Sequence, residues 1–250
     1  MIDRLELNAK GQELREQFGE DAVSPIDIFA VAGQIDDLTL VFYPLGENIS
    51  GMCIRDQNVK LVAINSGMSY GRQRYSLAHE FYHLYYDDAM GYNVCAKKFD
   101  IKAENEKNAD QFASYFLAPY SSLRMLVRRL KGDDELTYEH MIRLEQYYGM
   151  SHQAMLWRLI SEKYITKEQA EQLGVGVMKK ARQLGYEDTL YRPMPLAVQK
   201  RTYGHYLRQV EELQNRGMVS NGKIEEFLLE AFREDMVFGE DTSSEEEMVD

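Results

Sequence analysis

The feature that most constrains this chain is the run His79-Glu80-Phe81-Tyr82-His83, in which two histidines stand four positions apart. On an α-helix, residues four apart lie on one face, about 6 Å apart along the axis, so both imidazoles can reach one metal ion. Glu80 lies one step around the helix, where it can contact a water on the metal rather than the metal itself. The pattern therefore predicts a helix with two zinc ligands, His79 and His83, and a general base, Glu80.

The residues around this motif favour a buried helix. From Ser76 to Tyr86, every flanking residue is uncharged apart from the motif itself. A solvated helix would carry charges on its outer face, so this composition suits a helix packed inside the protein. The spacing alone arises by chance in on the order of one chain in a hundred of this length. The uncharged flanking sequence is a second, independent feature, so it strengthens the prediction of a metal site.

A third ligand must come from another element, because catalytic zinc sites combine three protein ligands with one open position. The helix predicted over 103–117 has an apolar face that, extended back by one turn, reaches Glu106. Glu104 lies roughly 200° away around that helix and is expected to face solvent. Asp110 follows Glu106 by one turn and could accept a hydrogen bond from a ligand histidine, fixing its tautomer. An exposed helix acid for Glu106 and a solvated surface acid for Asp110 remain open alternatives.

The rest of the chain predicts an α+β fold. Three β-rich runs, Leu38–Tyr43, Gly51–Ile54 and Val59–Ile64, predict a small, mostly antiparallel sheet. Helices are expected over 5–18, Ile26–Ala32 (after Pro25), 72–87, 103–117, 121–131, 137–148 and 152–162. We expect an irregular stretch from Asp88 to Ile101 and a helical remainder, interrupted by an irregular connection over Gly185–Pro195.

A longer set of residues resembles the ImmA/IrrE family of metallo-endopeptidases. The similarity covers roughly residues 25–165 and includes a strand ending in Ile64-Asn65. Its motifs are Arg74-Tyr75-Ser76-Leu77-Ala78-His79-Glu80-Phe81-Tyr82-His83, then Glu106-x-x-Ala109-x-x-Phe112-Ala113, then Phe116-Leu117-Ala118-Pro119. The resemblance implies one Zn²⁺ per chain on His79, His83 and Glu106, with Glu80 as the base. One departure is Tyr82, where many members carry glycine; a tyrosine there would narrow the cleft and leave the metal ligands untouched.

The resemblance also implies a fold and a function. It implies a zincin-like core over residues 1–120, made of the small sheet and the metal helix. From the pattern of the chain itself, we expect a helical, helix-turn-helix-like segment over 121–175, a C-terminal helical region over 176–238 and an acidic, disordered tail over 239–250. Members of the family cleave a specific protein, usually a helix-turn-helix repressor or antitoxin from a neighbouring gene, often on mobile elements. Some serve stress responses or act as toxins.

Composition narrows the function classes. The net charge of −12 argues against a generic nucleic-acid binder, which needs a basic surface to hold phosphates. The charged N-terminus does not resemble a signal peptide, and no apolar run approaches the roughly 20 residues of a membrane span. Two cysteines cannot make a disulfide framework. We therefore expect a cytoplasmic protein with no membrane partner.

Two segments, one with helix-turn-helix spacing and one rich in basic residues, suggest functions other than peptide hydrolysis. Residues 144–159 have helix-turn-helix spacing, with Gly149 at the turn. Six acidic residues stand against three basic ones between Asp133 and Lys163, which favours a structural helix pair, or protein docking, over DNA contact. The basic run over 124–131 is typical of a solvated helix face; a docking patch for an acidic substrate or phosphate is the alternative. The rival functions are a non-cleaving regulatory binding module and a DNA-binding transcription factor.

The last expectation concerns how a protein substrate is held. A peptidase must present an extended backbone, and adding the substrate as a strand to an exposed sheet edge achieves this. The run Val59–Ile64 has strong strand character, so we hypothesise that it, or its neighbour Gly51–Ile54, forms the floor of the cleft. Val59, Leu61 and Ala63 are then candidate substrate contacts. The alternative is an interior strand with no free edge.

Overall fold

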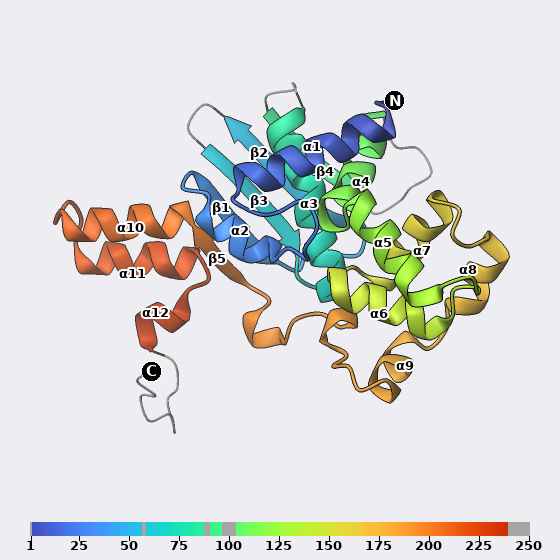
Figure 1. The fold of residues 1–250 in the computed structure, drawn as a ribbon. Helices are drawn as coiled ribbons and strands as arrows, with labels where there is room; N and C mark the ends of the chain where they lie inside the picture. The colour runs from blue at the N-terminus through green and yellow to red at the C-terminus, as the bar shows by residue number, and fades with distance from the viewer. Residues whose placement is uncertain (1, 57–58, 88–90, 97–103, 240–250) are drawn as a thin grey trace.

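A computed structural model describes residues 2–56, 59–87, 91–96 and 104–239, with the backbone alone described for 91–96. Its α+β architecture confirms the predicted fold class: one small sheet is packed against helices (Figure 1). The acidic tail from residue 240 onward lies outside the described residues.

The sheet has five strands in the order β4-β2-β3-β1-β5. Their bounds are β1 Leu38–Tyr43, β2 Ile49–Asp56, β3 Val59–Asn65, β4 Gly91–Ala96 and β5 Arg201–Gly204. Only β1 and β3 pair in parallel; β2 pairs antiparallel with β3 and β4, and β5 pairs antiparallel with β1. The predicted mostly antiparallel sheet is therefore confirmed.

Two strands were not predicted. β4 lies in the stretch expected to be irregular, and β5 lies in the remainder expected to be helical. Each contains a glycine, which is depleted in strands, and only a few strand-favouring residues, so the local sequence gives a weak strand signal. They form because β2 and β1, far away in the sequence, offer edges to pair with.

Twelve helices occur in the described part of the chain, and those over 5–18 and 72–162 lie where they were expected to within two residues. They are α1 Arg4–Gln17, α2 Ile28–Gln34, α3 Tyr70–Tyr86, α4 Glu104–Leu117, α5 Tyr120–Lys131, α6 Tyr138–Tyr148, α7 His152–Ser161, α8 Lys167–Leu173, α9 Val177–Gln183, α10 His205–Asn215, α11 Asn221–Glu230 and α12 Glu234–Phe238. α2 begins two residues later than predicted, because the Asp27 side chain accepts from the N–H groups of Phe29 and Ala30 and caps the helix there.

The helices form two groups around the central layer. Figure 1 shows α5–α9 on one side of the molecule, while α10–α12 extend from the opposite side, next to β5. The second group has a small core of its own around Val210, Ile224 and Leu228. It reaches the sheet through a ring contact between Phe232 and Tyr43, whose centroids lie 5.4 Å apart.

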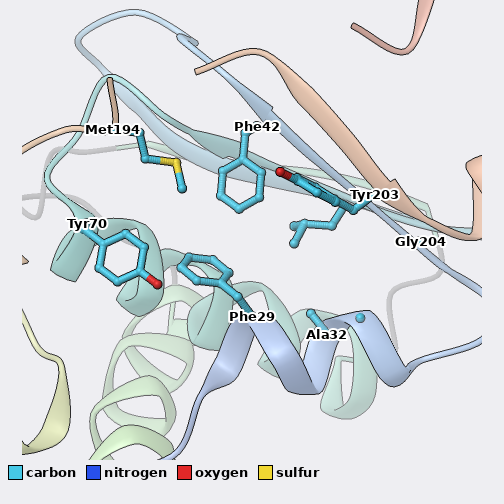
Figure 2. Close-up of a pocket in the computed structure, with 9 residues that line it drawn as sticks. Phe29, Ala32, Phe42, Tyr70, Met194, Tyr203 and Gly204 are labelled. Atoms are coloured by element: carbon cyan, nitrogen blue, oxygen red, sulfur yellow. The ribbon is translucent and has the colours of Figure 1, made fainter. Parts of the chain in front are cut away.

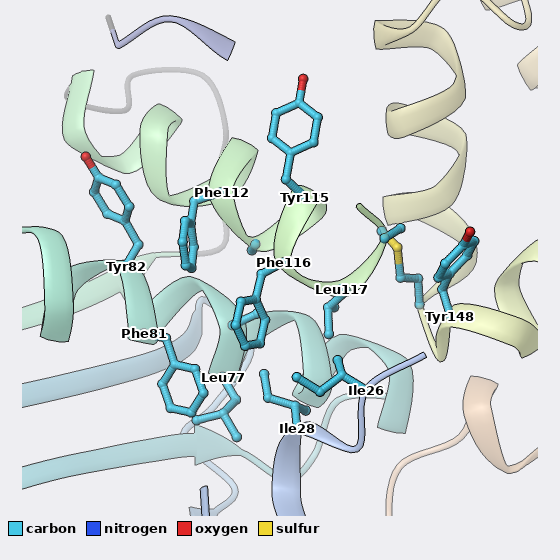
Figure 3. Packing of buried hydrophobic residues seen from close by; sticks show 14 of the residues in the cluster. Ile26, Ile28, Leu77, Phe81, Tyr82, Phe112, Tyr115, Phe116, Leu117 and Tyr148 are labelled. Atoms are coloured by element: carbon cyan, nitrogen blue, oxygen red, sulfur yellow. The ribbon is translucent and has the colours of Figure 1, made fainter. Parts of the chain in front are cut away.

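Helix α3 lies between the sheet and α4. Its side chains Leu77 and Phe81 are fully buried, and the ring of Phe81 meets that of Phe116 edge-on at 5.9 Å (Figure 3). β2 and β3 pack against α3 on the sheet side. The uncharged composition around His79 and His83 thus corresponds to a helix that is buried over most of its length.

The edge-strand hypothesis for the substrate is wrong. β3 pairs with β2 on one side and with β1 on the other, and β2 pairs with β3 and β4, so neither strand offers a free edge. Side chains alternate along a strand, and Val62 and Ile64 are in the core that includes α3. Val59, Leu61 and Ala63 therefore point to the opposite face of the sheet. The outermost strand beside β2 is β4.

Arg15 joins α1 to the end of α4. Its side chain is completely buried. Its Nε donates to the carbonyl of Asp21 at 2.7 Å, its Nη1 donates to the carbonyl of Phe116 at 2.7 Å, and its Nη2 donates to the carbonyl of Ser24. Burial lowers the pKa of Arg15, and the nearby Asp21 partly offsets this effect. One guanidinium thus satisfies two carbonyls of the segment after α1 and a third at the end of α4, about a hundred residues away.

We predict that Arg15→Met reduces the free energy of unfolding by about 2–4 kcal/mol, because it leaves buried carbonyl groups without donors. Arg129→Met is the matched control: Arg129 lies on the exposed face of α5, so its loss should change stability by less than about 0.5 kcal/mol. Urea unfolding of both variants measures the difference. Equal stability of the two variants would show that Arg15 does not hold these segments together.

Candidate metal centre

Three side chains converge from two helices. His79 and His83 come from α3 and Glu106 comes from α4, and a possible ligand atom of each lies within 4.8 Å of the others. The two Nε2 atoms are 3.2 Å apart. The carboxylate oxygens of Glu106 lie 3.4 Å from Nε2 of His79 and 3.2 Å from Nε2 of His83. The histidine side chains are nearly inaccessible, at 5% and 2% exposure, whereas Glu106 is 18% exposed.

These separations fit the ligand set of one tetrahedral metal ion. With metal–ligand bonds of about 2.0–2.1 Å, two ligands of a tetrahedral zinc are about 3.3–3.4 Å apart. The two Nε2 atoms, 3.2 Å apart, lie close to that value, and each nitrogen has one oxygen of the Glu106 carboxylate at a similar distance, 3.4 Å for His79 and 3.2 Å for His83. Two imidazole nitrogens and one carboxylate are also a donor set typical of catalytic zinc, with a fourth position left for water.

The outer nitrogen of each imidazole faces a carboxylate. Nδ1 of His79 lies 2.9 Å from Oδ1 of Asp110, and Nδ1 of His83 lies 3.0 Å from Oδ2 of Asp87. A carboxylate accepts, so each Nδ1 is assigned the proton and each Nε2 keeps its lone pair. The two lone pairs and the Glu106 carboxylate then face a common point, which is the state that binds a metal.

Further hydrogen bonds hold the Asp87 carboxylate and the backbone of Asp110. Nδ2 of Asn105 donates to Oδ2 of Asp87, and the hydroxyl of Tyr82 donates to Oδ1 of Asn105 at 3.3 Å. Tyr75 donates to the backbone carbonyl of Asp110 at 2.6 Å. Burial, and then the charge of Asp110, raise the pKa of Tyr75 well above its usual value, so its hydroxyl stays protonated.

Tyr82 is directed into the core rather than across the metal centre. Its side chain is 1% exposed and packs against the rings of Phe112 and Tyr86 (Figure 3). In this orientation its hydroxyl reaches Asn105 on α4. The tyrosine at position 82, where a glycine was expected from the family resemblance, therefore joins α3 to α4.

Glu80 is completely buried beside strand β2. A Cβ atom added at Gly51 would lie 2.8 Å from Oε1 of Glu80 and 3.3 Å from the carbonyl oxygen of Ala63. The pairing of β2 with β4 is irregular at this point, between Ile49 and Gly51. The absence of a side chain at Gly51 therefore makes room for the Glu80 carboxylate.

The electrostatics of Glu106 depend on the two histidines. Burial raises the pKa of Glu106, but when the two rings are doubly protonated their hydrogen bonds and positive charge outweigh burial and hold the pKa below its usual value. Glu106 is therefore an anionic donor at neutral pH. Glu104, two residues earlier, is exposed, as the helical phase predicts.

Sequence reasoning missed three residues of this centre. Asp87 follows His83 by four positions, the same spacing that joins the two histidines, so a longer search along the helix could have found it. A glycine inside a strand, like Gly51, indicates a close approach by another group. Asn105 gives no local signal, because its role depends on how α4 packs against α3. The structure brings Asp110 to His79, whereas the side chains of Val59, Leu61 and Ala63 lie on the face of the sheet away from α3.

No helix in the described part of the chain is both long and apolar enough to cross a membrane. A search of curated proteins found no significant match. The family model of the IrrE N-terminal-like domain, Peptidase_M78, matches residues 37–159, which span β1 to α7 and contain the whole metal centre. This segment of the chain therefore belongs to the ImmA/IrrE family of metallopeptidases, as an IrrE N-terminal-like domain.

Proposed function

We propose that this protein is a zinc-dependent endopeptidase, with zinc held by His79, His83 and Glu106 and with Glu80 as general base. The observation that carries the proposal is the convergence of these three donors at separations near those of a tetrahedral ligand set. Membership of a metallopeptidase family supports the same reaction class.

The mechanism assigns a task to each side chain. Bound zinc would supply Lewis-acid polarisation of the scissile carbonyl and a lowered pKa for the attacking water. Asp110 and Asp87 accept the Nδ1–H groups and keep the Nε2 lone pairs directed at the ion. Glu80 removes a proton from the attacking water as the new C–O bond forms. It then delivers that proton to the leaving nitrogen as the C–N bond breaks.

The substrate we propose is a specific protein, a helix-turn-helix repressor or antitoxin encoded by a neighbouring gene. This assignment rests on the family resemblance. Because β2 and β3 are paired on both sides, an extended substrate would instead add to β4, the outermost strand beside Gly51 and Glu80.

The packing of the helix-turn-helix-like pair disfavours DNA binding. The Nε of Arg74 on α3 donates to the carbonyl of Gly149 at 3.0 Å, in the turn between α6 and α7. A Cβ atom added at Gly71 on α3 would lie 2.8 Å from the backbone nitrogen of Ser151, the N-cap of α7. A recognition helix reads bases with its N-terminal residues. Here that end of α7 packs against the metal helix, which supports a structural role.

We predict that the purified protein contains about one zinc per chain, and that His83→Ala loses most of it. Glu106→Gln should also weaken zinc binding strongly, whereas the matched variant Glu104→Gln should retain it. Asp110→Ala should fall between them, with about 10–100-fold weaker binding. Elemental analysis and zinc titration measure all four. Absence of any divalent metal, together with no binding of added zinc, would overturn the proposed site.

Glu80→Gln separates metal binding from chemistry. The amide keeps the shape of the side chain but cannot act as a base, so zinc content should stay at the wild-type level while cleavage falls by about 100-fold or more. The assay incubates the protein with the product of its neighbouring regulator gene and maps the cut by mass spectrometry. Normal cleavage by Glu80→Gln would exclude Glu80 as the base. Metal binding with no cleavage by the wild type would favour a non-cleaving binding module.

Gly51→Ala tests the space beside Glu80. The added methyl would contact the Glu80 carboxylate and displace it, so cleavage should fall by about tenfold or more while zinc content is unchanged. Gly222→Ala, where the new methyl meets open space on α11, is the matched control and should cleave normally. If Gly51→Ala cleaves as fast as the control, the position of Glu80 does not depend on this glycine.

A further inference from the structure

A cavity of about 250 Å³ lies on the side of the sheet where α2 packs (Figure 2). Its walls come from α2, the inner faces of β1 and β5, the first residue of α3 and Met194 in the segment before β5. None of the residues that line it belongs to the metal centre. Small molecules bind mainly in concave, apolar pockets that open to the surface, so a space of this size with an apolar lining is a candidate binding site.

Aromatic rings form most of the wall. Phe29 contacts Phe42 and Tyr70, with ring centroids 5.3 and 5.4 Å apart, and Phe42 meets Tyr203 edge-on at 5.9 Å. Met194 adds a thioether, a group that makes favourable contacts with aromatic rings (Figure 2). Tilted and edge-on rings present both faces and edges to the space, which suits a flat aromatic guest.

The charge around the cavity selects against cations. None of the residues that line it is charged. Beside this wall the guanidinium of Arg233 lies over the ring of Tyr203, 5.6 Å from its centroid, and both oxygens of Asp235 accept from that guanidinium at 2.8 Å, so this carboxylate is already paired. Nη2 of Arg208 would be 3.9 Å from a Cβ atom on Gly204. A cationic guest would lose its hydration and gain no anionic partner, so the cavity suits a neutral one.

The cavity has a mouth at the surface. Gly33 lines it, is exposed, and has nothing within 4 Å of the position that a Cβ atom would take. Tyr203 on the opposite wall is 38% exposed. A cavity of about 150 Å³ is large enough to hold benzene, so about 250 Å³ accommodates two fused rings.

We propose that this cavity is a binding site for a small, neutral, flat aromatic compound of one or two rings. The site is separate from the metal centre and does not depend on the proposed peptidase activity. Its floor includes Tyr70, the first residue of α3, whose backbone N–H donates to the carbonyl of Arg192 at 2.7 Å. A bound ring would therefore touch both the start of the metal helix and the segment that leads into β5.

Calorimetric titration of the full-length protein with indole tests the proposal, with tryptamine as the cationic counterpart that carries the same ring. We expect saturable indole binding with a Kd below about 1 mM, and binding of tryptamine at least tenfold weaker. Gly33→Leu should weaken indole binding at least tenfold by filling the mouth. Gly222→Leu, at a helical glycine that also faces open space, should stay within twofold of the wild type.

A second measurement keeps the test decisive if Gly33→Leu does not fold. Nuclear Overhauser contacts from indole protons to the methyl groups of Met194 and Leu40 would place the ring inside the cavity of the wild-type protein. Three results would overturn the proposal: no saturable indole binding, equal binding of tryptamine, or saturable binding without those contacts.

Discussion

The packing of α3 between the sheet and α4 determines where every metal-binding atom lies. Leu77 and Phe81 anchor the helix in the core, and this fixes the direction in which His79 and His83 point. Ala109 and Ala113 are fully buried on α4, and their small side chains let the two helices approach closely. Glu106 reaches the imidazoles because α4 is held at this short distance. The chemistry of the centre thus follows from the burial of one helix against two layers.

Burying two imidazoles and several carboxylates is costly unless each is paired. In the structure, each imidazole N–H has a carboxylate as its acceptor, and these two carboxylates thereby have donors. Asp110 and Asp87 accept from the outer imidazole nitrogens, and Asn105 and Tyr82 extend the second chain of hydrogen bonds onto α4. Such a network fixes the tautomers before any metal arrives, so binding requires little rearrangement of the protein.

Local sequence rules located the parts of the centre that lie on helices. Helical spacing placed His79, Glu80 and His83 on a buried helix, and helical phase distinguished Glu106 from Glu104. The same rules missed β4 and β5, which exist only because distant strands pair with them. They also gave the wrong interpretation of Val59–Ile64, since the sequence of a strand does not reveal how many neighbours it has. Non-local pairing was therefore the information that sequence reasoning lacked.

The position of β5 in the sheet has a consequence for the order in which the chain folds. β1 begins at Leu38, but its antiparallel neighbour is made more than 150 residues later, at Arg201–Gly204. A ribosome releases the chain from its N-terminus, so one side of β1 stays unpaired until residues 201–204 have been synthesised. Unpaired strand edges invite association with other chains. Until residues 201–204 fold back onto β1, this edge of the sheet stays open to association with other chains, so β5 protects a strand far from it in the sequence.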